Sequence, residues 1–136
     1  MPIDVEPVPP VRPYRAATLR VLAGWLAGRD DRSRWRLVAE FLEEFGHEPR
    51  DARGGLLAEE PGPTGDERWD VFVAALAEYL TARDGAPAPD WSEARTLRRF
   101  WFPFNTPAAR VDAVVHAPAA FRRRGVFIAP QELAVA

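Results

Sequence analysis

The chain carries three consecutive arginines near its C-terminal end, in the segment HAPAAFRRRGVFIAP at residues 116–130. Guanidinium groups bind the phosphates of nucleic acids and the carboxylates of proteins, so Arg122, Arg123 and Arg124 are candidate binding residues. On a helical turn three successive side chains spread over roughly 200 degrees, so they cannot all enter one groove. With Phe121 buried beside them, we expect at least two to face water and to meet carboxylates of this chain or of a partner protein.

A second group of candidates mixes aromatic rings with arginines between residues 91 and 104. Aromatic side chains beside cations can stack on nucleic-acid bases, and tryptophan and arginine are frequent anchors of protein–protein interfaces. Aromatic rings also supply core area to a small helical domain, and we favour that role for most of them. The candidate partner contacts of the whole chain are Arg98, Arg99, Trp101, Arg122, Arg123 and Arg124.

Residues that could carry out catalysis are scarce. The chain has no cysteine and no lysine, and its two histidines, His47 and His116, lie far apart in the sequence. Neither Ser33 nor Ser92 falls in a nucleophile motif, and the segment ARGGLL is not a phosphate-binding loop. We therefore expect no enzymatic activity.

Carboxylates are more frequent, but their spacing does not predict a metal centre. Glu40, Glu43 and Glu44 lie close together on one predicted helix. A helical bundle that holds two metal ions needs Glu-x-x-His motifs on facing helices, and the sequence has no such pair of motifs. We expect solvated acidic faces and helix caps, and neither a metal nor a cofactor.

Charge is unevenly divided along the 136 residues. The net charge is −2, but residues 1–90 have a net charge of −6 and residues 91–136 a net charge of +4. This asymmetry indicates either an end that faces a partner or two ends of one fold that attract each other, and we favour the second. The slightly acidic total makes nucleic-acid binding by this chain alone the weaker hypothesis.

The length of the chain fits a single domain with a real hydrophobic core. No stretch approaches the roughly 20 apolar residues of a membrane span, and the first residues lack the pattern of a secretion signal. We therefore expect a cytoplasmic protein without membrane contact.

Apolar periodicity and capping signals predict an all-α fold of four to six helices with almost no strand. The five prolines among residues 1–13 predict an extended arm, and residues 14–134 a single helical domain that begins with a helical hairpin at 14–46. Helices are expected at residues 14–29, 30–46, 50–59, 66–83, 91–100 and 107–116, with a further turn at 119–124. The residues after Gly125 predict a short extended segment.

Three apolar stripes at helical spacing predict the core. Their residues are Leu19, Leu22 and Leu26; Trp35, Val38, Leu42 and Phe45; and Trp69, Phe72, Val73, Leu76 and Leu80. The third stripe belongs to the most strongly marked helix, for which Thr64 or Asp66 is the expected N-cap. We therefore expect Trp69 to be buried.

Four segments appear in a characteristic order: LLAEEPGPTGDERWDVFVAALAEYL, APDW, RRFWFP and VHAPAAFRRRGVFIAPQEL. The block at residues 56–134 that contains them resembles a poorly characterised actinobacterial family of small proteins, some of which carry an N-terminal helix-turn-helix. Members of that family are often encoded beside a protein with a nucleotidyltransferase-like fold, in an arrangement like that of toxin–antitoxin pairs.

The resemblance implies a non-enzymatic, antitoxin-like protein-binding module that restrains a nucleotidyltransferase-type partner. The first 55 residues depart from the regulator-like relatives, because they hold an arm and a helical hairpin without an evident DNA-reading helix. A DNA-binding transcriptional regulator, in dimeric form, is the alternative, and a homodimer is compatible with both hypotheses.

Overall fold

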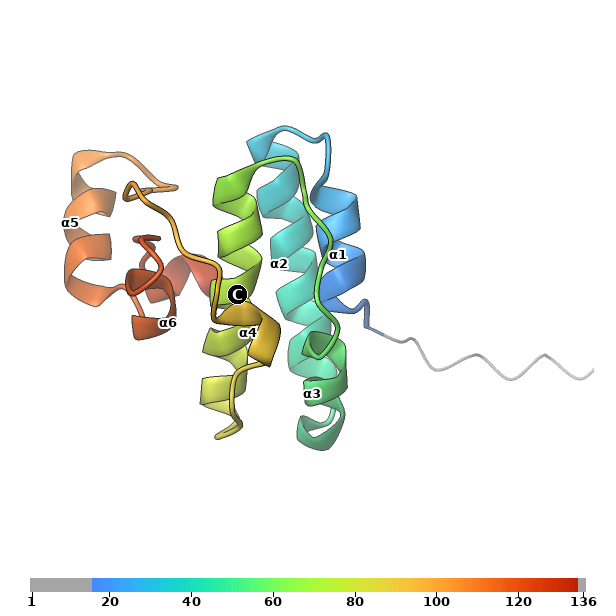
Figure 1. Ribbon diagram of the computed structural model, residues 1–136. Helices are drawn as coiled ribbons and strands as arrows, with labels where there is room; N and C mark the ends of the chain where they lie inside the picture. The colour runs from blue at the N-terminus through green and yellow to red at the C-terminus, as the bar shows by residue number, and fades with distance from the viewer. Residues whose placement is uncertain (1–15, 135–136) are drawn as a thin grey trace, which may run out of the picture.

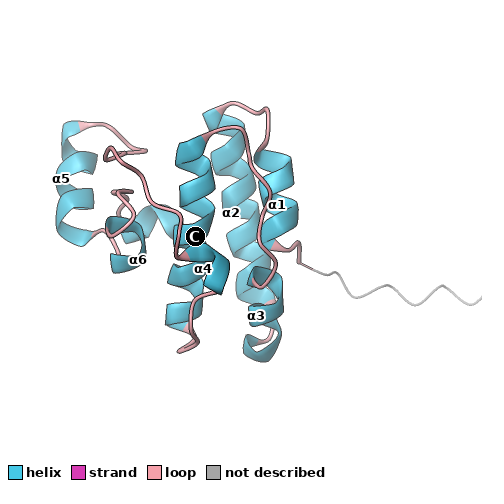
Figure 2. Ribbon diagram, in the orientation of Figure 1, coloured by secondary structure: helices cyan, strands magenta, loops and turns pink. Residues whose placement is uncertain are grey.

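The computed structural model describes residues 16–134, and this range forms six α-helices and two 3₁₀-helices. They are α1 (Leu19–Leu26), α2 (Asp31–His47), α3 (Arg50–Leu57), α4 (Glu67–Arg83), η1 (Asp90–Ser92), α5 (Pro107–His116), α6 (Ala119–Arg122) and η2 (Pro130–Leu133). The described residues contain no sheet (Figure 2), which confirms the all-α prediction. The proline-rich arm predicted at residues 1–13 lies outside the described range.

Helix α4 lies in the middle of the molecule, with α1, α2 and α3 on one side and α5 and α6 on the other (Figure 1). Ten of its 17 residues are buried, and they extend around much of its circumference. A helix with this pattern must be covered on several sides. Helix α4 therefore joins the N-terminal helices to the C-terminal part of the chain.

Helices α1 and α2 form the predicted hairpin. Thr18 and Asp30 cap them, and the side-chain oxygens accept hydrogen bonds from the backbone N–H groups of Val21 at 3.2 Å and Ser33 at 2.8 Å. Such caps satisfy backbone donors that have no partner within the helix. Helix α1 begins only after Thr18, so it is shorter at its start than the predicted helix at residues 14–29.

The N-cap of α4 is Asp66, whose Oδ1 accepts a hydrogen bond from the backbone N–H of Arg68 at 3.0 Å. Of the two expected caps, Asp66 is therefore the correct one. Thr64 has a different role: its hydroxyl donates to the carboxylate of Asp70 at 2.7 Å. This bond fixes the end of the loop that enters α4.

An aromatic cluster forms the centre of the core. Trp69 is fully buried, as predicted, and its ring lies 4.8 Å from that of Trp35 and 5.3 Å from that of Phe72, centroid to centroid. Its indole N–H donates to Asp31 at 3.1 Å, so the polar edge of the ring is also satisfied. The predicted stripes of α1, α2 and α4 all contribute to this core.

The helix predicted at residues 91–100 is wrong, because only the single 3₁₀ turn of η1 forms there. After this turn the backbone pairs with residues 124–127 instead of with itself. Leu97 N–H donates to Arg124 O at 2.9 Å, Trp101 N–H to Gly125 O at 2.8 Å, and Phe127 N–H to Trp101 O at 2.9 Å. Hydrogen bonds to a distant segment thus replace the local bonds of a helix.

Helix α5 has the predicted bounds, with Thr106 as its N-cap and Pro107 as its first residue. The expected extended segment after Gly125 is present but short: Val126 forms a single parallel bridge with Trp101, and η2 follows at Pro130–Leu133.

No helix among residues 16–134 is long and apolar enough to cross a membrane.

Candidate protein-binding surface

The three consecutive arginines have three different environments. Arg124 is only 1% exposed, although it was a candidate partner contact. Its guanidinium donates to Ala120 O at 2.9 Å and to Ser92 O at 3.0 Å, and it forms an ion pair with Glu78 of α4. Arg124 therefore holds α4, α6 and η1 together and is not accessible to a partner.

Arg123 lies at the surface but binds the same carboxylate, with Nε and Nη2 at 2.9 and 2.5 Å from Glu78 Oε2. Partial burial by itself raises the pKa of the Glu78 carboxyl. The hydrogen bonds and positive charges of Arg124 and Arg123 outweigh this effect, so the pKa lies below its usual value. This contact joins the basic C-terminal part to the acidic N-terminal part, as expected if the two ends attract each other.

Arg122 has no carboxylate partner among the described residues. Its guanidinium lies 5.7 Å from the ring centroid of Phe127, and Nη2 donates to Val114 O at 2.6 Å. These contacts place an exposed positive charge against the side of α5. Arg122 thus remains a candidate partner contact.

Trp101 is half-buried and packs inward. Its ring lies 5.6 Å from that of Trp69 and 6.5 Å from those of Trp35 and Phe72, while the guanidinium of Arg68 covers it at 5.1 Å. The structure therefore places this candidate mainly in the core.

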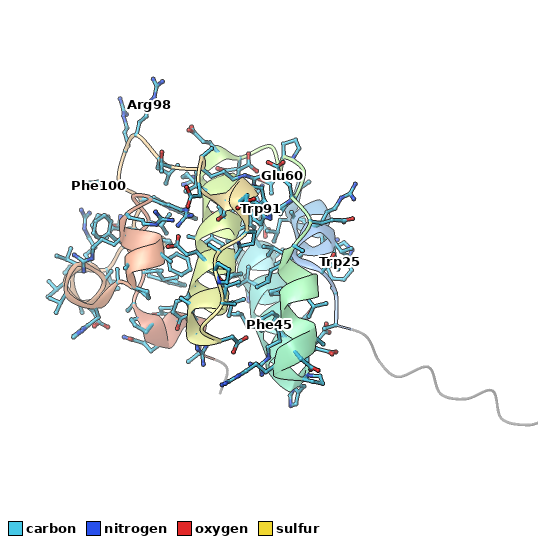
Figure 3. All side chains as sticks on the ribbon, turned by 60° about the horizontal axis from the view of Figure 1, so that its bottom comes forward. Trp25, Phe45, Glu60, Trp91, Arg98 and Phe100 are labelled. Carbon is cyan, nitrogen blue, oxygen red and sulfur yellow. The ribbon has the colours of Figure 1, made fainter. Side chains whose placement is uncertain are left out.

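Arg98 and Arg99 lie on the loop that leads to Phe100, and both are exposed. Arg98 extends from this loop away from the body of the molecule, and Phe100 lies on the same loop (Figure 3). Phe100 is 73% exposed, so the general expectation of a core role for these aromatic residues is wrong at this position. Neither arginine has an ion-pair partner within residues 16–134.

A ladder of rings connects Phe100 to α5. Phe100 lies 5.0 Å from Phe127, and Phe127 stacks on Phe102 at 5.1 Å with an angle of 17° between the ring planes. Arg110 of α5 covers Phe102 at 4.5 Å from the ring centroid. The exposed loop, the C-terminal segment and α5 therefore share one continuous surface.

Helix α5 presents an apolar face to solvent. Val111 is 67% exposed and Val115 61%, and Val114 is also exposed. Ala113, on the inner side of the helix, is its only fully buried residue. Exposed apolar residues that gather in one place, with polar groups at the edge, are typical of interaction sites.

The arginines of the described range fall into two equal groups. Eight have a carboxylate within 4.0 Å: Arg20, Arg34, Arg50, Arg53, Arg68, Arg95, Arg123 and Arg124. Eight have none: Arg29, Arg32, Arg36, Arg83, Arg98, Arg99, Arg110 and Arg122. In the second group, Arg110 and Arg122 lie beside the exposed valines of α5, and Arg98 and Arg99 directly precede the exposed Phe100. We call this set the α5 surface; it comprises Arg98, Arg99, Phe100, Arg110, Val111, Val114, Val115 and Arg122.

Sequence reasoning found three members of the α5 surface: Arg98, Arg99 and Arg122. It missed Arg110 and the exposed apolar residues. The only signal for the valines was their spacing at i, i+3 and i+4, which equally predicts a buried helix face. Whether such a face is covered depends on the rest of the fold.

The described residues show no cluster suited to metal-assisted chemistry. Within residues 16–134, no group of three or more histidine, aspartate or glutamate side chains could hold a metal ion. In comparisons with protein families, curated proteins and solved structures, the chain has no match.

Proposed function

We propose that this chain is a non-enzymatic, cytoplasmic protein-binding module that docks a partner protein on the α5 surface. The observation that carries the proposal is the exposed apolar face of α5, which has Arg110 and Arg122 beside it and connects through Phe127 to the exposed loop of Arg98, Arg99 and Phe100. None of these four arginines has a carboxylate partner within residues 16–134. Apolar anchors surrounded by charged groups are typical of specific protein interfaces. These four arginines favour a partner with carboxylates around an apolar patch.

The resemblance of residues 56–134 makes a nucleotidyltransferase-type protein the proposed partner, restrained in an antitoxin-like manner. Five members of the α5 surface lie in the resembling segments: Arg98, Arg99, Phe100, Val115 and Arg122. Restraint by binding needs no catalytic group on this chain, in agreement with the scarcity of catalytic residues in the sequence.

Co-purification with the product of the neighbouring gene, proposed to be nucleotidyltransferase-like, tests this proposal. We expect a stable complex that the double substitution Val111→Asp and Val115→Asp weakens at least about tenfold, because two charges would then be buried at the interface. Circular dichroism should show that the variant retains its helix content, since both side chains are exposed in the free chain.

The matched control is Val21→Asp, an exposed valine on α1. It should leave the affinity unchanged. Wild-type affinity in the α5 double variant, or equal weakening by the control, would rule out the α5 surface as the docking site.

A DNA-binding regulator is the second candidate, because the same four arginines could contact phosphates. An electrophoretic shift assay on the DNA upstream of the coding sequence distinguishes the DNA-binding function from the protein-binding function. Binding that weakens steeply with salt and disappears in the Arg98→Glu, Arg99→Glu variant would support DNA binding through counterion release. On the first proposal we expect no such shift.

A further inference from the structure

A cleft separate from the α5 surface opens where α2 and α4 end and α3 begins. These helix ends lie at the lower end of the bundle in Figure 1. Its volume is about 940 Å³, and η2 forms its remaining wall. Clefts of this size are in the range that binds small molecules. Neither the proposed partner binding nor the fold itself requires it.

The deepest part of the cleft is apolar. Phe45 of α2, Leu80 of α4 and Leu133 of η2 line it and are largely buried. Phe45 lies between α3 and α4 at this end of the molecule (Figure 3). A ligand in the cleft could therefore cover apolar side chains from three elements.

The rim carries three arginines. Arg53 is held in place, because it donates to Gly46 O at 3.0 Å, to Glu48 O at 3.0 Å and to the carboxylate of Asp84 at 3.1 Å. Arg50 lies 3.5 Å from the same carboxylate, with a side chain that is 75% exposed. Asp84 thus already has a close partner in Arg53, and Arg50 is free to turn toward a ligand.

Arg83 is the least engaged of the three. Its guanidinium lies 5.6 Å from the ring centroid of Tyr79 and forms no hydrogen bond or ion pair with any described residue. The three arginines and the two lining carboxylates, Glu43 and Asp84, give the lining a net charge of +1. This charge suits a ligand with a single negative charge.

We propose that this cleft binds a small amphipathic carboxylate. The carboxylate group pairs with Arg50 and Arg83 at the rim, and the apolar body lies on Phe45, Leu80 and Leu133. Arginine matches this group well because its planar guanidinium offers two parallel N–H donors to the two carboxylate oxygens. Arg53 and Asp84 have a supporting role, since their mutual contact fixes the wall between Arg50 and Arg83.

The test uses octanoate as the probe and octanamide as its uncharged match, each titrated into the full chain and followed by NMR. We expect octanoate to shift the resonances of Leu80 and Leu133 with saturation, and octanamide to bind at least about tenfold more weakly. Equal binding of the two probes, or no saturable shift with octanoate, would overturn the proposal.

Substitutions then identify the arginines that bind the carboxylate of octanoate. Arg83→Gln and Arg50→Gln should each weaken octanoate binding several-fold and leave octanamide binding unchanged. Arg36→Gln is the matched control, because Arg36 is an exposed arginine on α2 outside the cleft lining and has no carboxylate partner among the described residues. Unchanged octanoate affinity in both rim variants, confirmed folded by circular dichroism, would also overturn the proposal. The outcome is independent of partner binding at the α5 surface.

Discussion

At the scale of single residues, Trp69 is the side chain on which the core depends most. It is fully buried, contacts Trp35, Phe72 and Trp101, and has its N–H satisfied by Asp31. We expect Trp69→Ala to lower the free energy of unfolding by roughly 3–5 kcal/mol, because it removes apolar contacts and leaves a cavity.

Urea unfolding monitored by circular dichroism measures this change. Trp25→Ala is the control. Because Trp25 is 47% exposed on α1, this substitution should lower the free energy of unfolding by well under half as much as Trp69→Ala. A similar loss in both variants would contradict the assignment of Trp69 to the centre of the core.

Glu78 makes a second prediction at this scale. Its pKa lies below the usual value in the folded state, despite the opposing effect of burial, because Arg124 and Arg123 bind the charged form. A carboxyl of this kind stabilises the fold above its unfolded pKa, and that contribution is lost as the pH falls through the folded pKa.

Glu78→Gln should therefore be less stable than the wild type near neutral pH, and the difference should shrink as the pH falls below about 4.5, the usual value for a glutamate. Denaturant melts of both proteins across this range measure it. A stability difference that does not change with pH would show that the charge of Glu78 is not what holds α6 to α4.

At the scale of elements, the crossing between residues 97–101 and 124–127 fixes the C-terminal part of the fold. Gly125 sits at this crossing with φ of +84°, and a Cβ there would lie 3.3 Å from Leu97 Cβ and 3.4 Å from Leu97 O. Two effects therefore favour glycine: the left-handed backbone and the close approach of another segment.

Gly65→Ala separates these effects. Gly65 has a similar φ of +88°, but no atom lies within 4 Å of the added Cβ. Only the left-handed backbone conformation therefore opposes the substitution there. We expect Gly65→Ala to cost about 1 kcal/mol and Gly125→Ala clearly more, up to about 3 kcal/mol. Thermal unfolding of the two variants measures the difference, and equal losses would show that the crossing tolerates a methyl group.

At the scale of the whole molecule, the division of charge has two consequences. Part of it is satisfied within the fold, through Arg123, Arg124 and Glu78. The α5 surface carries four further arginines that have no carboxylate partner within residues 16–134. The basic end of the sequence therefore both closes the fold and places exposed positive charge on this surface.

Charge reversal at Arg98 and Arg99 tests whether the arginines of the α5 surface contribute to partner binding. Arg98→Glu with Arg99→Glu should weaken partner binding about tenfold, mainly through slower association, and should reduce its dependence on salt. Arg32→Glu with Arg36→Glu is the control, because these exposed arginines on α2 also lack carboxylate partners in the described part of the chain. Surface plasmon resonance at two salt concentrations measures both variants. Equal effects of the two pairs would mean that only the total charge matters.

The sequence by itself determined the elements whose signals are local. Apolar residues repeat along α2 and α4 at helical spacing, and Asp30 and Thr106 cap α2 and α5 with their own side chains. Each signal acts within a few residues of the structure it predicts. The all-α class, most helix bounds and the burial of Trp69 followed from these signals, as did the expectation that at least two of the three consecutive arginines face water.

The tertiary structure alone decided features that depend on contacts between distant residues. Residues 91–100 have a helical pattern, but after η1 the chain turns to residues 124–127, where the N–H groups of Leu97 and Trp101 find their acceptors. Arg124 is buried because Glu78, Ala120 and Ser92 converge on its guanidinium. The valines of α5 remain exposed because no other described element covers them. Spacing along the chain is the same for a covered and an uncovered helix face, so only the folded arrangement separates the two.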